Sequence, residues 1–586
     1  MRPFPVVFGD CAGWFHPVAV PAGRVVLLCG ADGYEGLCAH RPWRDLAVLL
    51  AEAGLPVLRF DPPGAGDAGG PEEAAPDLGL WADAVVAAAA EARRLSGAAE
   101  VSLVGLRLGA AAAALAAPRL DPAPVALLFP VLSGRAHART LRVLAAPSPE
   151  GPEVAGFPWT EAALAALARA EPAAALRTAA PRPVLLLARP EGLAAAAAML
   201  PDALAMPAEG YGAILADAHA AEGPRTAYAA IVAFLTENVP APAVPAAPAA
   251  PAVLRLPDGV TERAVRFGSE EGLVGTWTEP AGGARPGTPA LLILGTGANH
   301  HSGNGRLSVM MARRAAAAGW PVLRCDATGV GESENPDSTP LVRLLYGPGT
   351  VRDARAALDW LEERGHARVT VTGLCAGGWA ALQIAVADPR VVRAMPVNVQ
   401  VFVWRKGRLL TVPAFRQREE PPRSLRWEML GDAWKNGAAW PELFSLLMPR
   451  AARRAWQRRV VGGLATLGRI LPPALSPPVG PARAGAWIRT LAARGTRLTL
   501  VYSDEDCGVD TLEAHFGPRG RHLSAIPGMD VLFLPGADHT LSGRAMRSAW
   551  LERFSALIGG QRHATPDPEQ PSTPPPDRTQ AGPIAA

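Results

Sequence analysis

An internal repeat constrains the fold of this chain more than any other feature of its sequence. Residues 53–67 (AGLPVLRFDPPGAGD) recur at residues 318–332 as AGWPVLRCDATGVGE, and the offset between the copies is constant, so the match contains no gap. The same offset pairs the apolar run at 25–30 with the apolar run at 290–295. The sequence therefore predicts one structural unit that occurs twice.

Each copy has the pattern of a βαβ unit. A buried apolar strand is followed by a glycine turn, an amphipathic helix and a second strand that ends in aspartate. A third apolar strand then runs into a glycine-flanked turn and a helix, at residues 101–109 and 369–377. Alternating strands and helices favour a mostly parallel sheet covered by helices on both faces. The predicted fold class is α/β, with two such domains in tandem.

Composition predicts where the domains begin and end. Residues 239–256 are rich in proline and alanine, which suits a semi-rigid linker. Residues 561–586 are polar and proline-rich, a composition typical of disorder. We therefore expect a first domain at 1–238 and a second at 257–560.

The second copy carries a nucleophile motif. Residues 373–377 (GLCAG) place a potential nucleophile between two glycines, after a predicted strand and before a predicted helix. In such an elbow a sharp turn holds the central residue in a strained conformation, and the glycines let neighbouring backbone pass close by. We predict Cys375 as the nucleophile. The oxyanion donors would be the backbone N–H of Ala376 and the turn at Thr296 and Gly297.

A nucleophile needs a base, and the base needs an acid that orients it. His539 follows the last predicted strand, and Asp506 follows the strand before it, which is the chain order that this fold expects. Asp504 and Asp510 are close rivals for the acid, and Asp530 is a weaker one because it precedes the last strand. The predicted triad is Cys-His-Asp.

The first copy lacks all three roles. Arg107 stands at the nucleophile position, and alignment of the later strands puts Gly192 at the acid and Tyr211 at the base. Arginine stays protonated and cannot attack a carbonyl carbon. Arg107 either binds an anionic ligand at the helix N-terminus or pairs with a buried acid such as Asp32 or Asp61. We expect the first domain to keep the fold but to lack catalytic activity.

A long insertion distinguishes the second copy. About 75 residues separate the elbow from the acid-bearing strand in the first copy and about 120 in the second, a length typical of a functional loop or lid. We expect a helical lid at about 405–490 that either recruits an anionic partner or presents a solvated basic face. The tryptophans of this insertion are Trp427, Trp434, Trp440 and Trp456, and Trp404 lies at its edge. Its most basic stretch contains Arg453, Arg454, Arg458 and Arg459.

Composition limits the remaining expectations. The six cysteines form no C-x-x-C pair and no zinc spacing, so no metal and no cofactor are expected, and they suit a reducing cytoplasmic setting. A net charge of +3 calls for no nucleic-acid partner. The most apolar window is interrupted by Arg107, and the N-terminus lacks a signal-peptide core, so no membrane span is expected. His300 and His301 either line the site or are polar loop residues.

The motifs resemble those of the α/β-hydrolase superfamily, particularly its serine aminopeptidase-like or lysophospholipase-like branch. Residues 33–35, 38–41 and 105–109 look like one class of hydrolase associated with bacterial exosortase and exopolysaccharide systems, while residues 373–377 and 398–404 look like a companion class. The chain thus resembles a fusion of two such hydrolases. A cysteine in place of serine is similar to dienelactone hydrolases and argues against peptidase activity.

Together these features predict a hydrolase that acts on a small substrate with an ester, lactone or thioester. Two alternatives stay open: an acyltransferase in exopolysaccharide modification, and a non-enzymatic scaffold made of two pseudo-hydrolase domains.

Overall fold

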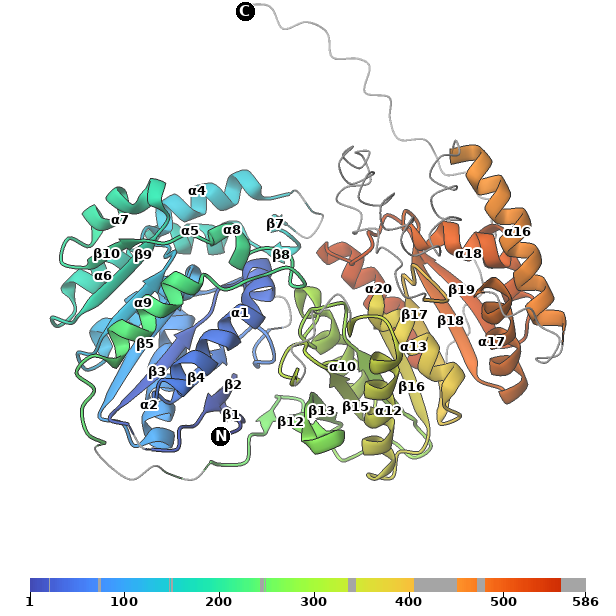
Figure 1. Ribbon diagram of the computed structural model, residues 1–586, viewed down its shortest axis with the longest axis horizontal. Coiled ribbons are helices and arrows are strands. Elements are labelled where there is room, and N and C mark those ends of the chain that lie inside the picture. Colours follow the sequence, from blue (N-terminus) through green and yellow to red (C-terminus); the bar gives the residue numbers. More distant parts are fainter. Residues whose placement is uncertain are drawn as a thin grey trace, which may run out of the picture.

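The computed structural model describes residues 1–586 except 21, 72–74, 147, 149–150, 243–246, 248, 336–343, 405–449, 472–479 and 560–586. Two large sheets, each with helices on both faces, lie side by side (Figure 1). A small hairpin, β7 (Glu153–Val154) and β8 (Phe157–Pro158), belongs to the first domain. The predicted class, two tandem α/β-hydrolase domains, is confirmed.

The first sheet has the strand order β1-β2-β4-β3-β5-β6-β9-β10. Strands β1 and β2 are antiparallel to their neighbours, and all pairs from β4 to β10 are parallel. The strands are β1 (Phe4–Phe8), β2 (Cys11–His16), β3 (Arg24–Cys29), β4 (Val57–Asp61), β5 (Glu100–Leu106), β6 (Val125–Leu128), β9 (Val184–Ala188) and β10 (Leu204–Pro207).

The second sheet repeats that order with one strand added at its antiparallel edge: β11-β12-β13-β15-β14-β16-β17-β18-β19. Its parallel part runs from β15 to β19. The strands are β11 (Leu254–Arg255), β12 (Thr261–Phe267), β13 (Leu273–Glu279), β14 (Ala290–Leu294), β15 (Val322–Cys325), β16 (Val369–Leu374), β17 (Val391–Val397), β18 (Arg497–Ser503) and β19 (Met529–Leu534). The sheet thus begins at Leu254, just inside the predicted linker.

The helices cover both faces of each sheet (Figure 1). In the first domain they are α1 (Gly33–Glu52), α2 (Leu78–Ser96), α3 (Leu108–Ala116), α4 (Gly134–Leu144), α5 (Glu161–Arg169), α6 (Pro172–Thr178), α7 (Leu193–Met199), α8 (Tyr211–Ile214) and α9 (Arg225–Thr236). In the second they are α10 (Leu307–Ala317), α12 (Pro348–Glu362), α13 (Ala376–Ala387), α16 (Arg450–Ile470), α17 (Gly480–Arg494), α18 (Gly508–Phe516), α19 (Arg521–Ser524) and α20 (Arg544–Ile558). Single 3₁₀ turns are η1 (Ala117–Arg119), η2 (Pro190–Gly192), η3 (Ser269–Glu271), η4 (Asn304–Arg306) and η7 (Pro518–Gly520).

The apolar runs that predicted the central strands are buried on both sides. In β3, Val26 and Leu28 join the core cluster under α1 and α9, while Val25 and Leu27 join the cluster on the opposite face, under α2 and α3. Successive side chains of a strand point to opposite faces, so a strand covered on both faces must be apolar throughout.

The predicted lid lies only partly within the described chain. Helix α16 falls inside the expected 405–490, while α17 begins inside it and ends at Arg494. Helix α16 packs against α17 and α18. Residues 405–449 and 472–479 lie outside the described residues, and so does the predicted disordered tail. The predicted residues whose side chains fall there or are otherwise not described are Trp427, Trp434, Trp440, Trp456, Arg453, Arg454 and Arg458. Among the described helices none is both long and apolar enough to cross a membrane.

The two domains meet through reciprocal buried ion pairs between equivalent positions of the repeat. Arg59 on β4 pairs with Glu332 of the second domain, with Nη1 2.8 Å from Oε1. Its counterpart Arg324 on β15 pairs with Asp67 of the first domain, with Nη1 2.7 Å from Oδ1. The first domain supplies the arginine of one pair and the acid of the other, and the second domain does the reverse. Such a reciprocal arrangement gives the interface the two-fold character of a homodimer. The repeat therefore shapes the interface as well as the domains.

The acids of the two reciprocal ion pairs, Asp67 and Glu332, each lie on a tight turn of their own copy of the repeat. The carboxylate of Asp61 accepts from the backbone N–H of Asp67, and that of Asp326 from the backbone N–H of Glu332, each at 3.0 Å. The glycine just before each acid, Gly331 in the second copy, has φ near +50° and leaves no room for a Cβ, which would meet the Asp326 carboxylate at 2.2 Å. Glycine is required there because it tolerates positive φ and lets the carboxylate close on the turn.

Arg324 neutralises two buried acids, Asp67 across the interface and Glu262 in its own domain, so its removal takes one cationic partner from each of them. We expect Arg324→Ala, whose side chain is fully buried, to lower the free energy of unfolding by about 3–5 kcal/mol. The measurement is urea denaturation of the full chain. The control Arg119→Ala removes an exposed pair with Asp83 and should cost less than about 1 kcal/mol. Equal losses in the two variants would contradict a stabilising interface.

Candidate active site

Cys375 lies at a strained turn between β16 and α13. Its backbone has φ 57° and ψ −113°, a region that residues other than glycine rarely occupy. A Cβ on Gly373 would lie 2.5 Å from the backbone of Gly377, and one on Gly377 would lie 2.4 Å from the carbonyl oxygen of Gly295. The flanking glycines therefore let the helix start pack directly against the end of β14, as the elbow motif requires.

The predicted base and acid are hydrogen-bonded to each other. His539 follows β19, Asp506 follows β18, and His539 Nδ1 bonds Asp506 Oδ2. Both residues are buried, and Asp506 also accepts from the backbone N–H of Gly508 at 2.6 Å. Burial alone would lower the pKa of His539, but hydrogen bonds to Asp506 and Cys375 and their charge raise it to about 10. The structure thus brings the three predicted triad residues together.

The rival acids lie elsewhere. Asp504 is partly exposed and faces Arg519 at 3.6 Å. Asp510 sits in the first turn of α18, and Asp530 is exposed on β19. Among these candidates only Asp506 has a hydrogen bond to His539 within the described chain.

Asn398, which was not a predicted site residue, fixes the loop that carries His539. It has φ 51° at the end of β17, donates to the backbone carbonyl of His539 at 2.8 Å and to Ser503 Oγ at 2.9 Å, and accepts from the backbone N–H of Ser503 at 2.7 Å. The Gln400 amide nitrogen lies 3.2 Å from His539 Nε2. These contacts could not be assigned from sequence because they join loops that are far apart in the chain.

The surroundings of the sulfur are aromatic on one side. The Tyr346 hydroxyl lies 3.7 Å from Cys375 Sγ, and the Tyr346 ring stacks on Trp404 with centroids 4.7 Å apart. Ala376 is the first residue of α13, while Thr296 and Gly297 follow β14, against which the start of α13 packs. The proposed oxyanion donors therefore belong to adjacent elements.

Domain one keeps the elbow geometry with different chemistry. Arg107 has φ 54° and ψ −118°, nearly the values of Cys375. Its guanidinium bonds the carboxylate of Glu35 at 3.0–3.1 Å and lies 5.4 Å from the ring centre of Tyr211. Gly192 ends the turn after β9. The acid that neutralises Arg107 is Glu35, one turn into α1, and not the predicted Asp32 or Asp61, because the α1 N-terminus faces the elbow.

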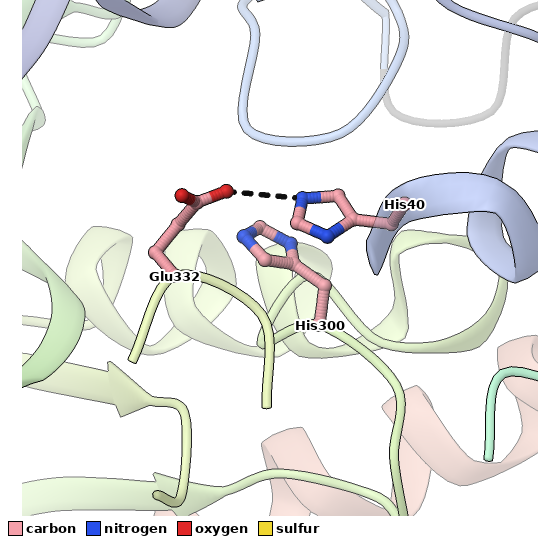
Figure 2. A group of neighbouring side chains, drawn as sticks. All are labelled: His40, His300 and Glu332. Atoms are coloured by element: carbon pink, nitrogen blue, oxygen red, sulfur yellow. Dashed lines mark ion pairs between the residues drawn. The ribbon is translucent and has the colours of Figure 1, made fainter. Parts of the chain in front are cut away.

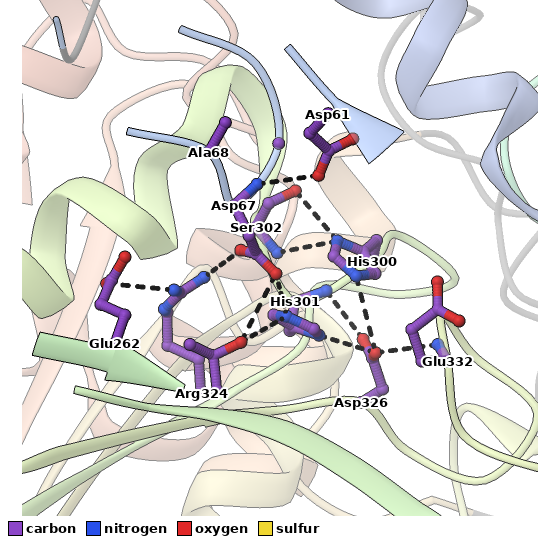
Figure 3. Close-up of polar contacts among 12 residues, drawn as sticks. Asp61, Asp67, Ala68, Glu262, His300, His301, Ser302, Arg324, Asp326 and Glu332 are labelled. Atoms are coloured by element: carbon purple, nitrogen blue, oxygen red, sulfur yellow. Dashed lines mark hydrogen bonds and ion pairs between the residues drawn. The ribbon is translucent and has the colours of Figure 1, made fainter. Parts of the chain in front are cut away.

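His300 and His301 lie between the two domains. His301 bridges Asp67 of the first domain (Nε2–Oδ2 2.6 Å) and Asp326 of the second (Nδ1–Oδ2 2.7 Å), and His300 stacks on His40 with centroids 4.3 Å apart (Figures 2 and 3). Burial lowers the pKa of His300 to about 3. Burial would also lower that of His301, but Asp326 and Asp67 raise it to about 10.

These histidines line a cavity between the two domains. It has a volume of about 200 Å³ and includes residues of both domains, while Cys375 is not among its lining residues. Two groups of side chains there place their potential ligand atoms within 4.8 Å of one another, and they share His300: His40 and Glu332 complete one group, Asp67 and His301 the other. Sequence spacing gave no sign of either group, because the members come from both domains.

The middle of the chain matches a known family. The model of the Dienelactone hydrolase family matches residues 301–398, which include the elbow. None of the curated proteins matches the chain.

Three solved structures are similar to about half of the chain. An α/β serine hydrolase homologue from Coxiella burnetii has 13% identity, covers 50% of this chain and 96% of its own, and has a TM-score of 0.28. Est1E from Butyrivibrio proteoclasticus with bound ferulic acid has 14% identity, coverage of 52% and 96%, and a TM-score of 0.29. A proline iminopeptidase from Mycobacterium smegmatis has 18% identity, coverage of 51% and 98%, and a TM-score of 0.29.

The raised pKa of His539 predicts a pH dependence of stability. Because the pKa in the folded chain, about 10, exceeds the ordinary 6.5, the contribution of His539 is fully present below pH 6.5 and is lost as the pH rises through about 10. The difference in Tm between the unchanged chain and His539→Gln should therefore shrink between about pH 6 and about pH 10. The exposed control His522→Gln should show little difference throughout. A constant difference for His539→Gln would contradict the assignment.

Domain one should not hydrolyse esters even with a hydroxyl at its elbow. We expect Arg107→Ser, made in a Cys375→Ala chain so that domain two is silent, to give no turnover of activated acyl esters. A serine without an adjacent base is a poor nucleophile near neutral pH, and Tyr211 supplies no base. Turnover by the double variant, measured by release of a chromogenic alcohol, would show that domain one holds a working site.

Proposed function

We propose that the second domain is a hydrolase that acts on a small ester, lactone or thioester through Cys375, His539 and Asp506. The observation that carries the proposal is the buried, hydrogen-bonded Asp506–His539 pair, which interacts electrostatically with a cysteine in a strained elbow. Arg107 has nearly the same backbone geometry in the first domain, so the buried His-Asp pair, and not the strain, distinguishes the second elbow. The family match over residues 301–398 supports a lactone or related ester as the substrate class.

The chemistry follows from the positions of the groups. His539 accepts the Cys375 thiol proton as general base, so the sulfur becomes the nucleophile. Sγ attacks the carbonyl carbon, and the carbonyl electron pair moves onto an oxygen held by backbone N–H donors. When the bond to the leaving group breaks, His539 protonates the departing oxygen or sulfur. The acyl group is then bonded to Cys375.

The second half of the cycle uses the same groups in reverse. His539, now neutral, removes a proton from water, and the hydroxide attacks the acyl carbon. Collapse of this intermediate breaks the bond to Sγ and releases the acid, with the proton back on His539. Asp506 holds the imidazole with Nε2 directed at the reacting atoms and stabilises its charge throughout.

The nucleophile is tested by trapping. We expect an activated acyl ester to add one acyl group to the intact chain, located at Cys375 by mass spectrometry. Cys375→Ala should show neither the adduct nor turnover. Turnover unchanged in Cys375→Ala would overturn the proposal. A scaffold without catalysis would give no adduct in either chain.

The acid is tested by kinetics. We expect Asp506→Asn to lower kcat by about 10⁴, since His539 loses the partner that fixes its tautomer. The matched control Asp504→Asn changes a carboxylate two residues away that faces Arg519, and it should leave kcat close to that of the unchanged chain. The reverse pattern would show that another acid orients the histidine.

A further inference from the structure

We propose that His40, His300 and Glu332 bind a divalent transition-metal ion, Zn²⁺ or one of similar ligand preference, between the two domains. His40 comes from helix α1 of the first domain, while His300 and Glu332 come from loops of the second (Figure 2). The site is separate from the proposed hydrolase, because Cys375 does not line this cavity.

The distances between the potential ligand atoms suit a metal ion that takes the place of the hydrogen-bond proton between His40 and Glu332. His40 Nε2 lies 3.2 Å from Glu332 Oε1, and the ligand atoms of all three residues lie within 4.8 Å of one another. Bonds of 2.0–2.2 Å in tetrahedral geometry separate two ligand atoms by about 3.4 Å. The first pair is thus already close to the spacing it would have around an ion, and the His300 ring needs only a small adjustment. In Figure 2 both imidazoles lie beside the carboxylate.

His300 supplies a ring nitrogen that can face an ion in the interdomain cavity. Its side chain is only 6% exposed. Nδ1 lies 3.3 Å from the Ser302 hydroxyl, whereas the nearest acid to Nε2 is Asp326 at 4.0 Å, beyond hydrogen-bonding distance (Figure 3). Within the described chain Nε2 has no hydrogen-bond partner. The backbone nitrogen of Ser302 also lies 3.4 Å from Nδ1 and donates to it when the ring proton is on Nε2. To bind an ion through Nε2, the ring must carry its proton on Nδ1 and donate it to the Ser302 hydroxyl, as metal-ligating histidines donate their other ring N–H.

The ligand set occurs on one side of an otherwise reciprocal interface. At the positions equivalent to the three proposed ligands, the repeat holds Gly305, Glu35 and Asp67. The first has no side chain, and Glu35 is engaged by Arg107. The interdomain symmetry accounts for the ion pairs but not for two stacked imidazoles beside a carboxylate. A specific role for this side of the interface explains them.

The second group of potential ligands, Asp67, His300 and His301, is less suitable as a metal site. Both ring nitrogens of His301 are already bonded, to Asp67 and to Asp326, and a metal there would have to break one of these buried bonds. Both oxygens of Glu332 accept from Arg59, but a carboxylate has about four lone-pair directions and can accept from an arginine while binding an ion.

The ligand types select the class of metal. Two imidazoles and one carboxylate suit Zn²⁺, Co²⁺ or Fe²⁺, whereas Mg²⁺ and Ca²⁺ prefer all-oxygen sites. Three protein ligands leave a fourth position for water or an anion, as in metal sites that are open to a ligand. The adjoining cavity of about 200 Å³ provides the space. Because the ligands come from both domains, the ion would hold the domains together.

The test uses the full chain, freed of metal by a chelator and then titrated with Zn²⁺. We expect one tightly bound Zn²⁺ per chain, retained on desalting, and a rise in Tm, because an ion that binds only the folded state stabilises it. Mg²⁺ should have neither effect. His300→Ala and His40→Gln should weaken binding by at least about 100-fold, beyond the 10–100-fold typical of a lost outer contact. The glutamine keeps a donor toward Glu332, so this second variant guards against misfolding of the first.

Two controls separate this site from others. His219→Ala removes an exposed histidine and should leave binding unchanged. Cys375→Ala should also retain the ion, whereas loss of the ion in Cys375→Ala and its retention in His300→Ala would place zinc at the thiol and overturn the proposal. No zinc bound by the unchanged chain, or binding by His40→Gln and His300→Ala as tight as that of the unchanged chain, would overturn it as well. None of these readouts depends on esterase activity.

Discussion

The need to neutralise buried arginines governs how the two halves of this protein fit together. Arg59 and Arg324 emerge from equivalent central strands, where an unpaired guanidinium would carry a heavy desolvation penalty. Each finds its carboxylate in the other domain, on the turn that follows the equivalent strand. The glycine beside each carboxylate is therefore part of the same constraint, because only a tight turn delivers the acid to the partner domain. Arg324 also pairs with Glu262 of its own domain, at 3.2 Å, so the second domain balances part of this charge by itself.

The same backbone supports two different outcomes in the two copies. Both elbows impose nearly identical positive φ values, so the strain belongs to the fold and not to catalysis as such. In the second copy the elbow presents a thiol next to a buried His-Asp pair. In the first it presents a guanidinium whose charge is satisfied by Glu35. An arginine that is already paired has little left to attract an anionic ligand, which favours the role of a structural ion pair over that of a binding site.

The proposed triad depends on contacts that hold its loops in place. Asn398 links the end of β17 to both β18 and the His539 loop, at a position where its own backbone is strained. Such side-chain hydrogen bonds fix the orientation of His539 on a loop that has no regular secondary structure. The interdomain cluster around His300 and His301 is built in the same way, from short loops joined by buried polar contacts.

The sequence by itself determined the features whose signals are local in the chain. The gap-free repeat predicted the two α/β domains, and the apolar strands with their glycine turns placed Cys375. Chain order placed His539 and offered Asp506 among rivals, and the hydrogen bond in the structure singles it out from them. Only the tertiary structure decided which groups meet across the repeat. It showed that Arg107 pairs with Glu35, and that His301 bridges two acids of which one, Asp67, lies 234 positions away. It also showed that His40 and His300 stack at an interface. These contacts form where two folded surfaces meet, and spacing along the chain carries no information about that meeting.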